Sequence, residues 1–226
     1  MMDLSALRSS IVNVFAEDGL RELPKDEYSA GKYPKLLPVM HFVIDRYRLE
    51  GFGHLMTMHT TSKVGMELLT AALMPYEGSD VPFMLLDIMQ MNKRIIVFVE
   101  YYDCTAEHPE QPLLQAVADK YAALHAYDEK PAWYVNERAP YSLIKEGTPE
   151  DENLMRECVL VSVTSYREVL REAKKNPANL EGLKVFRERM IKDGNPSSEI
   201  LNKVLGKEGA ATFFRKCVMP LNDKGE

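Results

Sequence analysis

Hydrophobic positions change their spacing along the chain, and the change separates two kinds of predicted element. Within residues 3–18 apolar side chains recur at helical spacing, which predicts a helix that ends before Gly19. The polar stretch that follows, with Pro24 and Gly31, predicts a loop. Over residues 39–103 the chain consists instead of short apolar runs bounded by turn residues, a pattern typical of strands.

Two tight connections predict how these strands pair. Residues 61–65 (TSKVG) and 91–94 (MNKR) each join two apolar runs and predict hairpin turns. Strands joined this closely must be antiparallel neighbours, because a parallel pair needs a long crossover. We therefore expect an antiparallel meander of about four or five strands over residues 39–103.

The second half of the chain has helical spacing. Residues 109–129 predict a helix whose apolar face carries Leu113, Val117, Tyr121 and Leu124. The T-P-E-D segment at 148–151 predicts the start of a second helix, which runs to about residue 174. The apolar stripe expected on this second helix consists of Leu154, Cys158, Val161 and Ser165. Shorter helices are expected over 180–191, 197–205 and 209–217.

The order of these elements predicts the fold class. Strands grouped first and helices grouped later favour the α+β class, with an antiparallel sheet covered by helices. The sequence contains no repeat, no low-complexity tract and no linker, so we expect a single domain over residues 1–226.

Composition and charge narrow the classes of function. The chain of 226 residues carries a net charge of −6, which argues against nonspecific nucleic-acid binding. Its three cysteines are far apart and odd in number, which argues for a reducing compartment and against a disulfide framework or a zinc site. No apolar run reaches the length of a membrane span, and no signal-peptide pattern begins the chain. We expect a cytoplasmic protein that binds neither nucleic acid nor membrane.

One acidic residue interrupts the apolar run P-F-M-L-L-D-I-M over residues 82–89. Strand alternation places Asp87 on the same face as Phe83 and Leu85. Its carboxylate either points at water on an outer face of the sheet or faces a ligand cavity. In a cavity, desolvation would raise the pKa of Asp87 and let the carboxylic acid donate a proton at neutral pH. The spacing leaves both interpretations open.

Several segments, in order, resemble a known family. The strand E-L-L-T-A-A-L-M-P, the loop Y-E-G-S-D-V and the strand P-F-M-L-L-D-I-M are similar to the core of the ferredoxin-dependent bilin reductases, the phytochromobilin-synthase-like enzymes. Four residues fall at the spacing of that family: Pro75, Pro82, Phe83 and Asp87. Segments 139–147 and 195–221 resemble later parts of the family, so the similarity extends from about residue 40 to residue 221.

The resemblance implies both a fold and a reaction. It implies a three-layer α/β/α sandwich with a central antiparallel sheet, and a linear tetrapyrrole such as biliverdin bound between the sheet and the C-terminal helices. The pigment would be reduced by single electrons from external ferredoxin, with no flavin or metal held by the enzyme itself. Asp87 matches the carboxylate that protonates the bilin, so the resemblance implies a catalytic role and a raised pKa for Asp87.

The chain departs from the family pattern where the pocket would be lined. Thr70 stands where several members have His or Asn, and Asn195 stands where they have a second Asp, so neither position can titrate. Leu85 replaces a glycine, and Lys145 is the nearest cation to the place of an expected arginine. We expect Thr70 and Asn195 to orient the pigment or a water, and Lys145 to be the substrate-binding cation.

Electron transfer from an acidic ferredoxin would need positive charge gathered locally on this acidic chain. The candidate residues are Arg187, Arg189, Lys203, Lys207, Arg215 and Lys216.

Three functions stay open. The first is reduction of a linear tetrapyrrole with Asp87 as the proton donor. The second is a non-catalytic protein of the same fold that binds a tetrapyrrole or another flat ligand, and the residues at positions 70 and 195 favour it. The third is an enzyme that acts on an unrelated substrate, because a fold does not determine a function.

Overall fold

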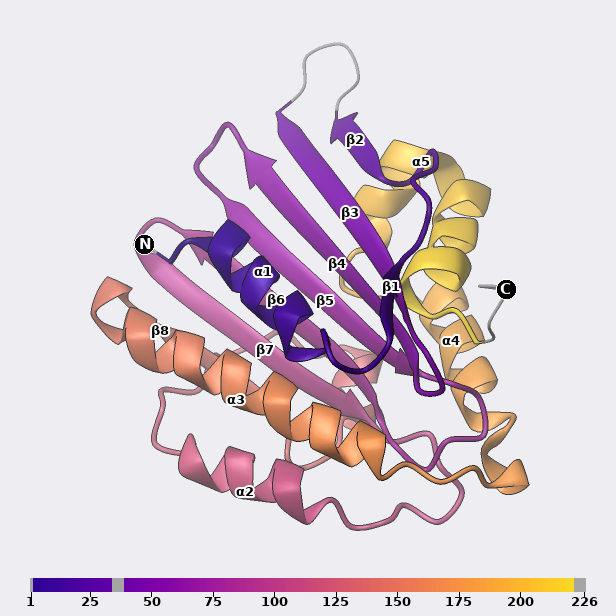
Figure 1. Ribbon diagram of the computed structural model, residues 1–226. Coiled ribbons are helices and arrows are strands. Elements are labelled where there is room, and N and C mark those ends of the chain that lie inside the picture. The colour runs from indigo at the N-terminus through magenta and orange to yellow at the C-terminus, as the bar shows by residue number, and fades with distance from the viewer. Residues whose placement is uncertain (1, 34–38, 222–226) are drawn as a thin grey trace.

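A single antiparallel sheet organises the protein, whose computed structural model describes residues 2–33 and 39–221 (Figure 1). The strand order is β1-β3-β4-β5-β6-β7-β8, and β2 also pairs with β3. The strands are β1 (Leu20–Glu22), β2 (Ala30–Tyr33), β3 (Met40–Leu49), β4 (Gly53–Ser62), β5 (Glu67–Pro75), β6 (Phe83–Met91), β7 (Arg94–Tyr102) and β8 (Leu143–Gly147).

Helices cover both faces of this sheet and complete a three-layer α/β/α sandwich (Figure 1). The helices are α1 (Leu4–Val14), α2 (Pro112–Lys120), α3 (Glu152–Arg171), α4 (Gly182–Lys192) and α5 (Ser198–Phe213). Short helical turns are η1 (Trp133–Glu137), η2 (Pro149–Asp151), η3 (Pro177–Asn179) and the π-type turn η4 (Phe214–Val218). Helices α1 and α3 lie on one face with α2 beside α3, whereas α4 and α5 lie on the other. The predicted fold class is confirmed.

The predicted meander is confirmed as the five strands β3 to β7. The hairpin between β6 and β7 turns through Asn92 and Lys93, whose φ angles of 52° and 63° fit a two-residue turn of the left-handed type. Alternation along each strand then sends side chains to two separate cores. On β6, for example, Leu86 belongs to the core under α1 and α3, and Leu85 belongs to the core under α4 and α5.

The polar stretch after the first helix is not wholly a loop. It contributes β1 and β2, which both pair with β3 and so satisfy backbone groups along its outer edge. Gly31 lies opposite Phe42, whose ring covers it so closely that a Cβ at position 31 would fall 2.1 Å from a ring carbon. The glycine that signalled a loop in the sequence is required here by close packing within a strand.

The helix expected over 109–129 is shorter than predicted, because α2 ends at Lys120. The following segment pairs with β8 instead: the Tyr127 N–H donates to the Ile144 carbonyl at 3.1 Å. Val117 and Tyr121 are buried as predicted, but at the start of α2 Leu114 is buried in place of Leu113, which is 46% exposed. Hydrogen bonds to a distant strand thus replace the last turns that local spacing predicted.

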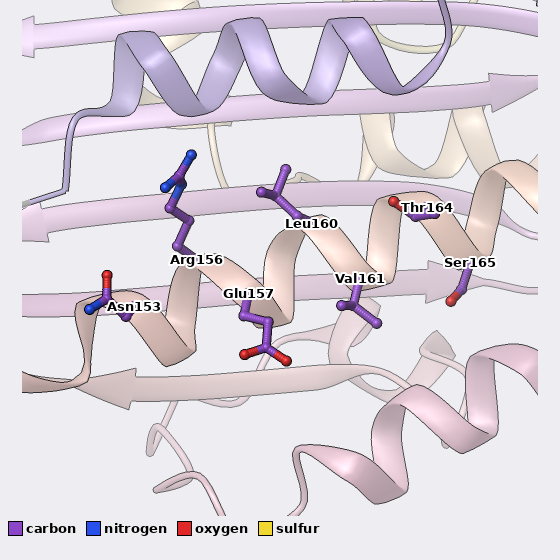
Figure 2. A pocket seen from close by; sticks show the side chains of 7 residues that line it. All are labelled: Asn153, Arg156, Glu157, Leu160, Val161, Thr164 and Ser165. Atoms are coloured by element: carbon purple, nitrogen blue, oxygen red, sulfur yellow. The ribbon is translucent and has the colours of Figure 1, made fainter.

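Helix α3 begins as predicted, since Thr148 forms a capping box with Asp151. It ends at Arg171, three residues before the predicted end, and its buried stripe is rotated from the prediction. The buried side chains are Met155, Cys158, Val159, Ser162, Val163, Tyr166 and Leu170. Val161 and Ser165 lie instead in a shallow depression on the outer side of α3 (Figure 2). Leu154 is 44% exposed.

Helices α4 and α5 fall close to the short helices predicted near the C-terminus. Two of those predicted segments are continuous in α5, although Gly206 interrupts its geometry with a φ of 72°. Within residues 2–33 and 39–221, no helix combines the length and the apolarity needed to cross a membrane.

Candidate functional site

Asp87 lies in the middle of β6 on the face of the sheet that α4 and α5 cover. The antiparallel register places it between Thr70 of β5 and Phe98 of β7. The Thr70 hydroxyl donates a hydrogen bond to Oδ1 of Asp87. A cross-strand pair on the same face therefore brings together two of the residues that the sequence singled out.

A small cavity of about 30 Å³ lies over Asp87. Its floor comes from the sheet and its roof from α4, α5 and the segments that flank α5. The lining residues are Met56, Met58, Thr70, Leu85, Asp87, Met190, Asn195, Pro196, Ser197, Leu201, Phe213, Phe214 and Val218. Among these lining residues, all within the described part of the chain, Asp87 is the one ionisable group.

The apolar surroundings decide the protonation of Asp87. Burial disfavours the charged carboxylate and raises the pKa of Asp87 from 3.8 to about 6, although the Thr70 hydrogen bond opposes this rise. The Asp87 carboxyl group thus holds its proton at far higher pH than a solvated aspartate does. An acid with a pKa close to neutrality is suited to proton donation in neutral solution.

Two larger hollows adjoin the cavity. A groove of about 410 Å³ between β2, β3, β4 and α5 shares Met58, Ser197, Leu201 and Phe213 with the cavity. We call it the α5 groove. A second hollow of about 340 Å³, which Lys192 and Lys207 help to line, shares Asn195, Leu201 and Phe214 with the cavity. Leu201 therefore separates the space above Asp87 from both neighbouring hollows.

Asn195 lines the cavity, but much of its amide is engaged in local structure. Its Nδ2 donates to the Met190 carbonyl at 3.1 Å, and its Oδ1 accepts from the Ser197 N–H at 3.0 Å. These bonds tie the end of α4 to the start of α5. Asn195 keeps one amide N–H and one oxygen lone pair with which a ligand could interact.

The structure does not bring Lys145 to this site. Lys145 lies opposite Val97, so its side chain points into the other core, under α1 and α3. Its ammonium group donates to the Ala122 carbonyl at 3.0 Å and to the Leu124 carbonyl at 2.9 Å. Lys145 thus satisfies two backbone carbonyls of the segment that follows α2. The prediction that Lys145 lies beside the ligand is wrong.

A second buried acid was missed by the sequence analysis. Glu100 of β7 is 1% exposed and lies opposite Leu85, on the same face as Asp87. The guanidinium of Arg138 donates to its Oε1 at 2.5 Å, and the Tyr102 hydroxyl donates to the same atom at 2.8 Å. Arg138 also pairs with Glu129. The signal was present in R-I-I-V-F-V-E, where an acid interrupts an apolar strand just as Asp87 does.

Glu100 is electrostatically coupled to Asp87. Burial raises the pKa of Glu100 to about 7, the Arg138 charge opposes this rise, and the neighbouring Asp87 charge adds to it. The two carboxyl groups therefore titrate as a pair, because ionising one disfavours ionising the other.

Comparison with known proteins finds a similar fold but no close relative in sequence. No family model matches the chain, and no curated protein matches its sequence. Among solved structures it is similar to phytochromobilin synthase from tomato in complex with biliverdin, with a TM-score of 0.79 and 11% sequence identity. The match covers 96% of this chain and 82% of that one. The likeness shows that this protein has a bilin-reductase-like fold.

Proposed function

We propose that this protein binds a linear tetrapyrrole such as biliverdin between the sheet and helices α4 and α5, and reduces it with Asp87 as the proton donor. One observation carries the proposal: a carboxyl group with a pKa of about 6 lines a cavity in a fold shared with a biliverdin-bound structure. The register that pairs Asp87 with Thr70 keeps this acid on the face that the helices cover.

The chemistry follows from adding electrons to a conjugated pigment. One electron from an external donor makes the bilin more basic, and the Asp87 carboxylic acid then transfers one proton to it. The Asp87 carboxylate takes a proton back from water, and a second electron and a second proton complete the reduction of one double bond. Each cycle thus consumes two electrons from the donor and two protons from solvent through Asp87.

Ligand binding requires the roof of the cavity to move. Pockets for ligands of this size measure about 300–1,000 Å³, whereas the cavity over Asp87 measures about 30 Å³. Displacing Leu201 and Phe213, which line both spaces, would join the cavity to the α5 groove of about 410 Å³. Gly194 and Gly206, with φ angles of 98° and 72°, flank the segment that carries Leu201 and offer it two flexible joints.

The electron donor is proposed to be ferredoxin or a similar protein. Several of the basic residues considered for its docking are already paired with acids: Arg187 and Arg215 with Glu188, Arg189 with Glu137, and Lys203 with Glu199. These pairs reduce the positive charge available to an acidic partner, so we expect weak, salt-sensitive docking. The turnover assay should therefore compare ferredoxin with a small chemical reductant.

The test separates binding from turnover. Biliverdin is titrated into the purified protein while its visible spectrum is followed, and a saturable one-to-one spectral shift is expected. Reduced ferredoxin is then added, and the bilin product is identified by its spectrum. Asp87→Asn should keep binding and lose turnover by trapping a one-electron-reduced pigment, whereas Asp119→Asn, on the exposed side of α2, should behave as the unchanged protein. Absence of any spectral shift would refute the proposal.

A second candidate is non-catalytic binding of a tetrapyrrole or another flat ligand on the same fold. It is favoured by the cavity lining, in which Thr70 and Asn195 cannot supply a proton in addition to Asp87. A saturable spectral shift without turnover by either reductant would support this candidate over the reductase.

A further inference from the structure

The proposed reaction needs two protons for each double bond, but the cavity offers one acid. Among the described residues that line this cavity, Asp87 is the one ionisable group. A second acid, Glu100, lies on the same face of the sheet, on the neighbouring strand and diagonally across the register from Asp87. Diagonal neighbours in an antiparallel pair lie about 7–8 Å apart. Glu100 is therefore placed to supply a proton to Asp87 rather than to the ligand itself.

The charges around Glu100 favour its neutral form. Arg138 is bound at two points by Glu129, and its Nε donates to Oε1 of Glu100 at 2.5 Å. One guanidinium thus faces two carboxyl groups, so the cluster would carry an uncompensated negative charge if both were ionised. Burial makes such a charge costly. The side chain of Glu129 is 21% exposed and that of Glu100 is 1% exposed, so the proton belongs on Glu100.

The hydrogen bonds of Glu100 leave one oxygen for this proton. The Arg138 guanidinium and the Tyr102 hydroxyl both donate to Oε1, so Oε2 can carry the proton while Oε1 accepts both bonds. Burial accordingly raises the pKa of Glu100 to about 7, above the value of about 6 for Asp87. As the pH rises Asp87 loses its proton first, and between these two values the pair holds one proton, on Glu100.

We propose that Glu100 stores the proton with which Asp87 is recharged during turnover. After Asp87 has protonated the pigment, the carboxylic acid of Glu100 passes its proton to the Asp87 carboxylate, and the Glu100 carboxylate takes up a proton from solvent. No electron moves in these two steps. Glu100 acts through Asp87 and does not touch the ligand, so it is a positioning residue. The inference rests on the proposed function and makes Glu100, instead of water, the immediate source of the second proton.

Groups that can pass protons lie on both sides of Glu100. Arg138 lines a hollow of about 720 Å³ beside the end of β7, whose lining is partly exposed to solvent. On the other side, burial and then the charge of Glu100 raise the pKa of Tyr134, and the charge of Asp87 adds to the rise, so the Tyr134 hydroxyl lies near both acids. A hydroxyl can both accept and donate a proton. The residues that roof Asp87 from α4 and α5 are not ionisable.

The order in which the two acids ionise is measured on the ligand-free protein, by carbon-13 NMR of their carboxyl carbons through a pH titration. Asp87 should titrate near pH 6 and Glu100 near pH 7. Glu129→Gln leaves Arg138 to Glu100 alone, so the pKa of Glu100 should fall by about one to three units. Glu157→Gln, on the opposite face of the sheet, should leave both titrations unchanged. A Glu100 that ionises before Asp87 in the unchanged protein would overturn the proposal.

The second experiment is a single turnover of bound biliverdin with a small chemical reductant, so that ferredoxin docking does not limit the rate. Its readout is the pH dependence of the step that completes the reduction. This rate should fall by half near pH 7, where Glu100 loses its proton. Glu100→Gln should slow the step at least about tenfold and move its midpoint to about pH 6, where Asp87 ionises. Glu129→Gln should move the midpoint in the same direction while keeping the Glu100 carboxyl group.

The variant Glu129→Gln keeps the test decisive if Glu100→Gln does not fold. A rate and a midpoint that stay unchanged in folded Glu100→Gln would overturn the proposal, as would an unchanged midpoint in a Glu129→Gln protein whose Glu100 has a lowered pKa. Failure of the proposed function would appear differently, as absent pigment binding. It would remove the purpose of the stored proton but leave the ligand-free titrations of Asp87 and Glu100 as expected.

Discussion

Replacing Asp87 by Asn should make the protein more stable at neutral pH while removing its proposed activity. The carboxyl group has a pKa of about 6 in the folded protein against 3.8 in its ordinary state. Below the lower value both folded and unfolded chains are protonated, so the group leaves stability unchanged. As pH rises between the two values the unfolded chain loses its proton first, and the stability of the folded state falls.

The magnitude follows from the size of the shift. A difference of about two pKa units corresponds to about 3 kcal/mol of lost stability once the pH exceeds the folded-state value. At about pH 4.5 the same shift costs only about 1 kcal/mol. Because Asp87 is only partly buried, the neutral-pH figure is an upper bound. Asparagine has nearly the same shape, carries no charge, and removes this cost.

The assay is urea unfolding of Asp87→Asn and the unchanged protein at about pH 7.5 and about pH 4.5. We expect the variant to gain up to about 3 kcal/mol at the higher pH and about 1 kcal/mol at the lower one, with unchanged slopes. Asp119→Asn, on exposed α2, should show no comparable pH-dependent gain. An equal difference at both pH values would show that Asp87 is not a buried acid with a raised pKa, and the reasoning would fail.

Three further substitutions test separate parts of the site. Thr70→Val removes the hydroxyl that donates to Asp87, so the pKa of Asp87 should rise by about one to two units in an NMR titration. Leu201→Ala shortens a side chain that lines both the cavity and the α5 groove. Biliverdin should therefore bind faster in stopped-flow mixing. An unchanged binding rate would contradict the proposal that this side chain moves to admit the ligand. Lys145→Met should lower the melting temperature but leave the biliverdin dissociation constant unchanged, because Lys145 donates hydrogen bonds to two backbone carbonyls on the opposite face of the sheet.

Local patterns predicted those features that depend on neighbours in the chain. The hairpin at Asn92 and Lys93 and the capping box at Thr148 are set by a few adjacent residues, and both formed as expected. The face of Asp87 followed from simple alternation along β6. The pairing of Asp87 with Thr70, in contrast, depends on the register between β5 and β6, which the sequence patterns did not predict.

Features that depend on distant partners were beyond local patterns. Lys145 faces away from Asp87 because of the register between β7 and β8, strands separated by a long connection. The buried stripe of α3 was predicted on the wrong side because Leu154 and Val161 form a plausible apolar face in the sequence. Contact with the sheet buries Met155 and its neighbours instead. The network around Glu100 requires Arg138, which approaches from outside the meander.

The two faces of the sheet have different roles: one contributes mainly to stability, and the other holds the candidate site. The face under α1 and α3 holds a continuous apolar core with fully buried Leu4, Leu7 and Ile11. The face under α4 and α5 holds the buried Glu100, the partly buried Asp87 and the cavity, which are features that cost stability. A purely structural acid would weaken the fold when neutralised. A gain in stability together with a loss of turnover in Asp87→Asn would therefore identify a group retained for its reaction.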